Sequence, residues 1–148
     1  MGDEGSVQVK RGAAPVFSDV RGKLTLVDSD AIPFEVTRAY VLSELPDGAR
    51  RAGHACRTQH RFLVGVSGTA VVTVDDGLHC DGIPLAGGGT IHVPPRTWIE
   101  IQADGKGVVI LVFADGPYDP RDHVSDRAEL RTAALSSAAA SATETVTT

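Results

Sequence analysis

The residues best suited to chemistry lie close together in residues 51–61, near the middle of the chain. His54 and Cys56 stand two residues apart, and the same segment contains three arginines, Arg51, Arg57 and Arg61. An imidazole changes charge near neutral pH, and a thiol beside arginines releases its proton more readily than an isolated one. The pattern predicts a site that moves protons, with guanidinium groups available to hold an anionic group.

The surrounding sequence predicts an all-β domain that holds this segment at a corner between strands. Segments rich in β-branched residues alternate with turn signals such as residues 75–77 and 104–107, and helical periodicity is almost absent. An antiparallel sandwich or barrel follows, with Ser67 and Gly68 closing one strand and a short helix after residue 120. The main expected strands are residues 23–27, 34–42, 50–56, 61–66, 69–74, 78–85, 98–102 and 108–113.

Length and composition favour one folded domain with loose ends. The chain has 148 residues, which suits a single core, and a net charge of -5, which argues against a nucleic-acid partner. We expect residues 1–14 to be flexible, residues 15–135 to form the domain and the Ser/Ala/Thr-rich residues 136–148 to be disordered. Without a signal peptide, a membrane-spanning run or a disulfide framework, a cytoplasmic protein is expected.

A metal site at the same corner is a competing interpretation, because zinc accepts His and Cys ligands. Metal-binding barrels of the cupin class combine two histidines and a glutamate with one later histidine. Here Arg61 stands at the glutamate position and Ile99 at that of the later histidine. A cation at Arg61 would repel a metal, so we expect neither a metal nor another cofactor.

Several phrases of the sequence occur in an order typical of one enzyme family. They are residues 19–24, 32–34, 38–40, 51–55, 66–69, 75–77, 94–98 and 117–119, followed by Asp122 and Asp126. On these phrases the chain resembles the nucleotide-sugar 3,4-ketoisomerases, which are metal-free cupins acting on dTDP-4-keto-6-deoxyglucose in deoxysugar and antibiotic biosynthesis. The resemblance implies a cupin jelly roll, or double-stranded β-helix, with a short C-terminal helix. It also implies a homodimer with exchanged N-terminal strands and a dTDP-linked ketosugar in the barrel mouth.

The corner and a late phrase depart from the family pattern. The family reads Arg-Gly-x-His-x-His there, and both histidines are tied to the proton transfers. His54 matches the first histidine, whereas Cys56 occupies the position of the second. Arg61 stands where the family usually has Gln, and the late phrase Asp-Tyr-Ile-Arg-Asp reads Asp-His-Val-Ser-Asp at residues 122–126.

The resemblance assigns roles to individual residues. Moving a ketone from C4 to C3 requires a proton to leave C3, an enediol, and a proton to arrive at C4. We expect His54 to be the base, Cys56 a second proton carrier or an inert neighbour, and Tyr40 a donor to the sugar or to the imidazole. The expected substrate-binding residues are Arg51, Arg61, Trp98 and Arg21, of which Arg21 is also a candidate dimer contact. The remaining histidines, His60, His79, His92 and His123, are expected at the surface or in packing.

Two other functions stay open. An epimerase acting on a related dTDP-ketosugar needs only removal and return of a proton beside the ketone, which His54 and Cys56 could supply. A catalytically inactive cupin would bind a nucleotide sugar or a protein partner without turnover.

Overall fold

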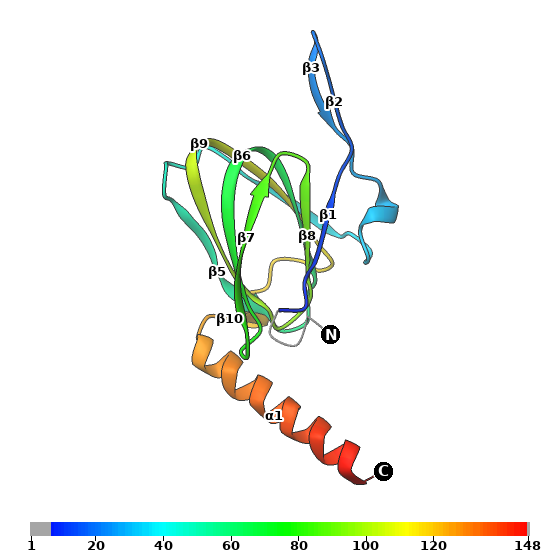
Figure 1. Cartoon of the computed structure of the whole chain (residues 1–148), viewed down its shortest axis with the longest axis vertical. Coiled ribbons are helices and arrows are strands. Elements are labelled where there is room, and N and C mark those ends of the chain that lie inside the picture. Colours follow the sequence, from blue (N-terminus) through cyan, green and yellow to red (C-terminus); the bar gives the residue numbers. More distant parts are fainter. Residues whose placement is uncertain (1–6, 148) are drawn as a thin grey trace.

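Two long, bent strands organise the computed structural model, which describes residues 7–147. These strands are β6 (Arg61–Asp75) and β9 (Trp98–Ala114). They pair antiparallel along their length, with Arg61 opposite Ala114 and Asp75 opposite Trp98. Each strand bends near its middle, so its two halves belong to different faces of the barrel (Figure 1).

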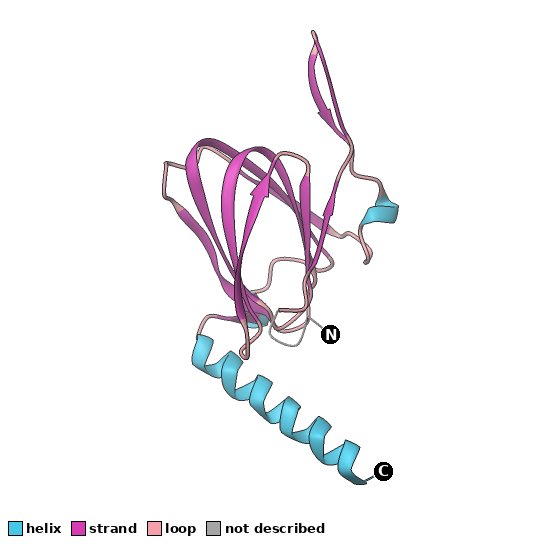
Figure 2. Ribbon diagram, viewed as in Figure 1, coloured by secondary structure: helices cyan, strands magenta, loops and turns pink. Residues whose placement is uncertain are grey.

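The other strands complete two faces around a buried core (Figure 2). One face contains β1 (Lys10–Ala13), β8 (Gly89–Val93), the first part of β6, the last part of β9 and β4 (Arg38–Leu42). The other contains β7 (Cys80–Ala86), the rest of β6, the first part of β9, β5 (Arg50–Cys56) and β10 (His123–Val124). Fully buried side chains such as Leu63, Val72 and Ile101 fill the space between them. The predicted all-β jelly roll is confirmed.

Two predicted turns are bends within strands. The sequence predicts that a strand ends at Ser67 and Gly68 and that residues 104–107 form a turn, but β6 and β9 continue through both places. Gly68 has a φ of 69°, and a Cβ there would lie 2.8 Å from the Cα of Val108. Glycine permits the left-handed backbone and this close approach, so the chain bends without reversing.

The N-terminal region is more ordered than predicted. Residues 10–13 were expected to be flexible but form β1 against β8, whereas residues 1–6 lie outside the described residues. Next, β2 (Val16–Asp19) and β3 (Gly22–Thr25) form a hairpin that projects from the barrel (Figure 1). The short 3-10 helix η1 (Ser29–Ala31) follows, and the expected strand over residues 34–42 is limited to β4.

The C-terminal helix is longer than predicted. After the 3-10 turn η2 (Pro120–Asp122), α1 runs over Arg127–Thr147, where a disordered tail was expected from residue 136. Alanine is the strongest helix former, and the tail is rich in it, which accounts for the continued helix. Leu130 anchors the first turns in the barrel, with 3% of its surface exposed. No described helix combines the length and apolar character needed to cross a bilayer.

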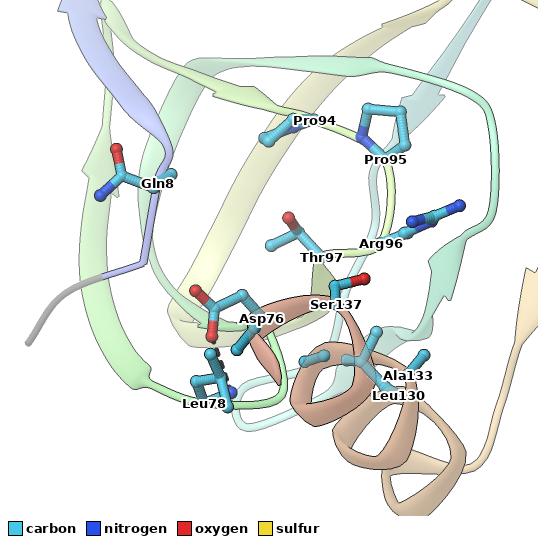
Figure 3. A pocket seen from close by; sticks show the side chains of 12 residues that line it. Gln8, Asp76, Leu78, Pro94, Pro95, Arg96, Thr97, Leu130, Ala133 and Ser137 are labelled. Atoms are coloured by element: carbon cyan, nitrogen blue, oxygen red, sulfur yellow. Dashed lines mark hydrogen bonds between the residues drawn. The ribbon is translucent and has the colours of Figure 1, made fainter. Parts of the chain in front are cut away.

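A hollow of about 380 Å³ lies between α1 and the turn at Pro94 and Pro95 (Figure 3). Its carboxylate, Asp76, already accepts hydrogen bonds from the backbone N–H groups of Leu78 and His79. None of the described residues that line this hollow is a histidine or a cysteine. It is therefore a weaker candidate for acid–base chemistry than the cavity described next.

Candidate active site

A cavity of about 590 Å³ lies among β4, β5 and β9. Alternation along β4 directs Arg38, Tyr40 and Leu42 to this side, as expected for a strand with a period of two. Three of the predicted site residues, Tyr40, Arg51 and His54, meet in its wall. The full lining is Arg38, Tyr40, Leu42, Arg50, Arg51, Ala52, His54, Ile99, Ile101, Val112, Tyr118 and His123.

A β-bulge in β5 aims His54 into the cavity. The pairing of β5 with β9 shifts register between Ala52 and His54, and Ala52 and Gly53 have positive φ values of 68° and 82°. A left-handed alanine costs on the order of 1 kcal/mol, and such strain is often kept at functional sites. Because the bulge breaks the alternation, Arg51, Ala52 and His54 all reach the same cavity.

His54, Cys56 and His123 form a compact group at one side of the cavity. One ring nitrogen of each histidine and the sulfur of Cys56 all lie within 4.8 Å of one another. The rings of His54 and His123 stack with centroids 4.0 Å apart and an interplanar angle of 23°. The pairing of β10 with β5 explains the grouping, since His123 is directly opposite Cys56 in the register.

The carboxylate of Asp122 fixes β10 against the corner. It accepts hydrogen bonds from the N–H and hydroxyl groups of Thr58, at 3.0 and 2.7 Å, and from the N–H of Gln59 at 3.3 Å. The N–H of Arg57 donates to the Asp122 carbonyl at 2.7 Å. His123, the next residue, is therefore held in place by its neighbour.

Arg61 is a buried cation behind this group. Its surface is 1% exposed, and its Nη2 donates to the carbonyl of Thr97 at 2.9 Å. Its Nε and Nη1 have no hydrogen-bond partner in the described part of the chain. A buried, incompletely paired guanidinium is costly, and it acts on nearby groups through its charge.

Burial and Arg61 together keep His54 uncharged. Burial, and next the charge of Arg61, lowers the pKa of His54 from 6.5 to about 4, while a hydrogen bond with the Ala52 backbone opposes the shift. The pKa of His123 is also lowered, first by burial and then by Arg61. A neutral imidazole at physiological pH has a nitrogen that can accept a proton.

The other two candidate acid–base groups stay protonated at neutral pH. Burial raises the pKa of the Cys56 thiol, with Arg61 opposing, so a thiolate is disfavoured. Burial likewise raises the pKa of the Tyr40 phenol, and the Arg38 guanidinium lies 5.4 Å from the centre of its ring. Tyr40 is therefore a hydrogen-bond donor in the cavity wall.

Three arginines make the cavity suitable for an anion. Arg38, Arg50 and Arg51 all line it. Arg50 is paired with Glu100 at 3.2 Å, whereas Arg38 and Arg51 form no ion pair within residues 7–147. Guanidinium groups bind phosphate oxygens in a bidentate manner, so the unpaired arginines are the better candidates for a pyrophosphate.

Three residues expected to bind substrate lie elsewhere. Trp98 is 9% exposed and packs with Ala55, Val124 and Leu130 beneath α1, because β9 turns its indole away from the cavity. Arg61 lies behind the cavity wall, so it acts through its charge. Arg21 is on the exposed β2–β3 hairpin, where its Nε donates to Asp19 at 3.1 Å. None of the three side chains lines this cavity in the described part of the chain.

The group of His54, Cys56 and His123 also has the donor atoms of a zinc site. Part of its environment opposes a metal. Arg61 holds a positive charge beside the three side chains, and the raised pKa of Cys56 disfavours the thiolate that zinc requires. The described residues add no carboxylate to the group, so the donor set fits a metal poorly.

Sequence reasoning missed two residues of the site. His123 was treated as a surface or packing residue, yet it stacks on His54. A signal was present, because residues 122–126 stand at a family phrase whose two aspartates are kept as Asp122 and Asp126, but nothing local showed that this phrase pairs with the corner. Arg38 was part of a quoted phrase but received no role, and β4 places it in the cavity.

Comparison with known proteins identifies the family. The model described as "FdtA: WxcM-like, C-terminal" matches residues 8–134. The chain belongs to this family. The family relationship predicted from the sequence is confirmed.

Individual relatives agree with this assignment. The chain is 29% identical over 108 residues to TDP-4-oxo-6-deoxy-alpha-D-glucose-3,4-oxoisomerase of Aneurinibacillus thermoaerophilus, covering 72% of this chain and 78% of the relative. The solved sugar 3,4-ketoisomerase QdtA of Thermoanaerobacterium thermosaccharolyticum, in complex with TDP, has a TM-score of 0.78 at 22% identity, covering 86% of this chain and 95% of that one. The 4-keto-6-deoxy sugar epimerase NovW of Streptomyces spheroides has a TM-score of 0.68 at 18% identity, covering 83% and 69%. The two solved structures support the shared fold.

Proposed function

We propose that this FdtA-like protein is a 3,4-ketoisomerase acting on a dTDP-linked 4-keto-6-deoxyhexose. The observation that carries the proposal is a neutral imidazole, His54, in a cavity that also presents Tyr40 and unpaired arginines. Family membership and the 3,4-oxoisomerase from Aneurinibacillus thermoaerophilus support the same reaction. No cofactor is needed, since the reaction moves only protons and a double bond.

The proposed reaction begins at His54. Its neutral ring accepts the proton of C3, the C–H electron pair forms a C3–C4 double bond, and negative charge passes to the C4 oxygen. Tyr40 is placed to donate a hydrogen bond to that oxygen, and its raised pKa keeps the phenol protonated for this purpose. The proton of the C3 hydroxyl passes to the C4 oxygen, and the imidazolium then returns a proton to C4 as the C3 carbonyl forms. Cys56 is a protonated thiol and stays uncharged throughout these reaction steps.

Binding of the nucleotide is assigned to the arginines of the cavity. We assign the pyrophosphate to Arg51 and Arg38, which line the cavity and have no competing carboxylate within the described residues. QdtA, which shares the fold, was solved with TDP. The negative net charge of the chain does not oppose this assignment, because local guanidinium groups govern contacts at a few ångströms.

A homodimer is proposed from the exposed β2–β3 hairpin. Phe17, Val20 and Leu24 on this hairpin are 59%, 104% and 56% exposed, and the hairpin pairs with no other described strand. Since β1 already pairs with β8 of its own chain, β2 and β3 are the N-terminal strands available for exchange. In that arrangement Arg21, between the two strands, becomes a contact to the second subunit. We place this dimer in the cytoplasm, in deoxysugar biosynthesis of the kind that serves antibiotics.

An NMR assay with dTDP-4-keto-6-deoxyglucose in deuterated water tests the function. The expected result is a carbonyl that moves from C4 to C3, with deuterium incorporated at C4. A changed stereocentre with the ketone still at C4 would identify an epimerase. Binding of the nucleotide sugar without exchange at any carbon would show an inactive cupin. Either of the last two results would refute the isomerase proposal.

A further inference from the structure

We propose that His123 is the second proton-transfer group of this site, so that β10 supplies the imidazole that the corner lacks at Cys56. The inference rests on the proposed isomerase function and adds a catalytic residue to it. Its basis is the position of His123 in the cavity wall, in contact with His54.

The geometry gives His123 access to the same ligand as His54. Both rings line one cavity and stack with centroids 4.0 Å apart. An atom bound against one ring is therefore within reach of the other. Tyr118, also in the lining, packs edge-on against His123 with centroids 5.7 Å apart and limits rotation of the ring.

The ring nitrogens of His123 are available for a substrate. Within residues 7–147 they form no hydrogen bond, although the ring is only partly exposed. A histidine that serves packing alone usually satisfies its polar atoms with protein partners. The backbone around His123, in contrast, is held by Asp122. A fixed backbone with unpaired ring nitrogens facing a cavity is the arrangement that proton transfer requires.

The register explains how one imidazole can replace another. His123 is directly opposite Cys56 in the β5–β10 pair, and the sulfur of Cys56 lies within 4.8 Å of one ring nitrogen of each histidine. A histidine at position 56 would enter from β5, and His123 reaches the same place from β10. The small thiol leaves room for the ring that crosses from the neighbouring strand.

The reaction has a step for this second imidazole. After His54 removes the C3 proton, the intermediate has a hydroxyl on C3 and a negative oxygen on C4. His123 accepts the proton of the C3 hydroxyl and returns a proton to the C4 oxygen. The C3 oxygen then becomes the oxygen of a new carbonyl as C4 takes the proton held by His54. Both imidazoles end in their starting state, and substrate and product are isomers.

The test uses His123→Phe, which keeps an aromatic ring stacked on His54 but removes both nitrogens. Product formation is expected to fall by about 10²-fold or more, the usual contribution of a general acid–base group. Exchange of the C3 hydrogen of the substrate with deuterated water is expected to stay within about threefold of the unmodified protein, because His54 performs it. Recovered substrate would therefore carry deuterium at C3 without becoming product.

A second variant separates chemistry from packing. Cys56→His combined with His123→Phe restores the family pair on β5 and is expected to recover product formation at least about tenfold over His123→Phe alone. His92→Phe, outside the cavity, is the matched control for loss of a histidine. Thermal unfolding of each variant verifies the fold.

The outcomes separate this inference from the proposed function. Unmodified protein that neither exchanges nor isomerises would overturn both. If it isomerises and His123→Phe does so at a similar rate, the inference alone is wrong. Parallel loss of exchange and turnover in His123→Phe, without recovery in the double variant, would show that His123 only supports packing.

Discussion

Replacement of Arg61 by glutamine tests how the buried charge sets the acidity of His54. The guanidinium is the second cause, after burial, of a pKa lowered from 6.5 to about 4. Glutamine is the residue the family usually carries there, so Arg61→Gln removes the charge with a side chain that suits the position. The pKa of His54 is expected to rise, because a like charge no longer opposes the imidazolium.

The expected rise in the pKa of His54 follows from the relative size of burial and of the charge of Arg61. Since burial is the larger one, loss of Arg61 recovers only part of the shift, and we take about one pKa unit, or about 1.4 kcal/mol, as the working figure. A base with a pKa of about 4 is about nine-tenths neutral at pH 5, whereas one near 5 is about half neutral. At pH 5 the variant should therefore keep about half of its maximal kcat/KM and the unmodified protein about nine-tenths.

The assay is the pH dependence of kcat/KM, which reports groups of the free enzyme. In both proteins kcat/KM should be constant near neutral pH and fall as the solution becomes acidic. The fall should occur at a lower pH in the unmodified protein than in Arg61→Gln. Arg57→Gln is the matched control, because Arg57 is an exposed arginine paired with Glu129 at 2.8 Å. An acid limb near pH 6.5 in the unmodified protein, or no shift in Arg61→Gln, would refute the electrostatic argument.

Four further predictions concern the catalytic groups, the metal and the dimer contact. His54→Ala should lower turnover by at least about 10²-fold with an unchanged circular dichroism spectrum, and near-normal turnover would remove His54 as the base. Cys56→Ala should change kcat by no more than a few-fold, because the raised pKa of Cys56 keeps the thiol protonated; a loss of about 10²-fold would show a catalytic thiol. Dialysis against a chelator should leave activity intact, and loss that zinc restores would contradict the metal-free assignment. Phe17→Asp should produce a monomer by light scattering if the exposed hairpin forms the dimer contact, whereas an unchanged dimer would exclude that contact.

The sequence contains enough local information to predict the strands. β-Branched segments separated by glycine and proline turns indicate an antiparallel barrel, and the corner with His54 is visible from residue types alone. The bends at Gly68 and near Gly105 were mistaken for turns, because a glycine with positive φ serves both purposes. The end of the helix was misplaced for a different reason: an alanine-rich tail is compatible with disorder and with helix until its structure is known.

The site was predictable only where its residues are neighbours in the chain. Tyr40, Arg51 and His54 were recognised, since each belongs to a phrase or a local cluster. The pairing of His123 with Cys56 joins positions 67 residues apart, and only strand register establishes it. Trp98 was expected at the cavity but is packed with Ala55, Val124 and Leu130, because only the placement of β9 decides which face the indole occupies.

The hydrogen bonds that Asp122 accepts have a consequence for local unfolding of the protein. The backbone N–H groups of Arg57, Thr58 and Gln59 all donate to residue 122, so the corner loop and the two-residue strand β10 must separate as one cooperative unit. Their amide hydrogens should then exchange with solvent at similar rates. A ligand bound against both His54 and His123 would hold β5 and β10 together and slow exchange of all three amides. Amide exchange at residues 57–59 therefore measures occupancy of the cavity even for a ligand that is never turned over.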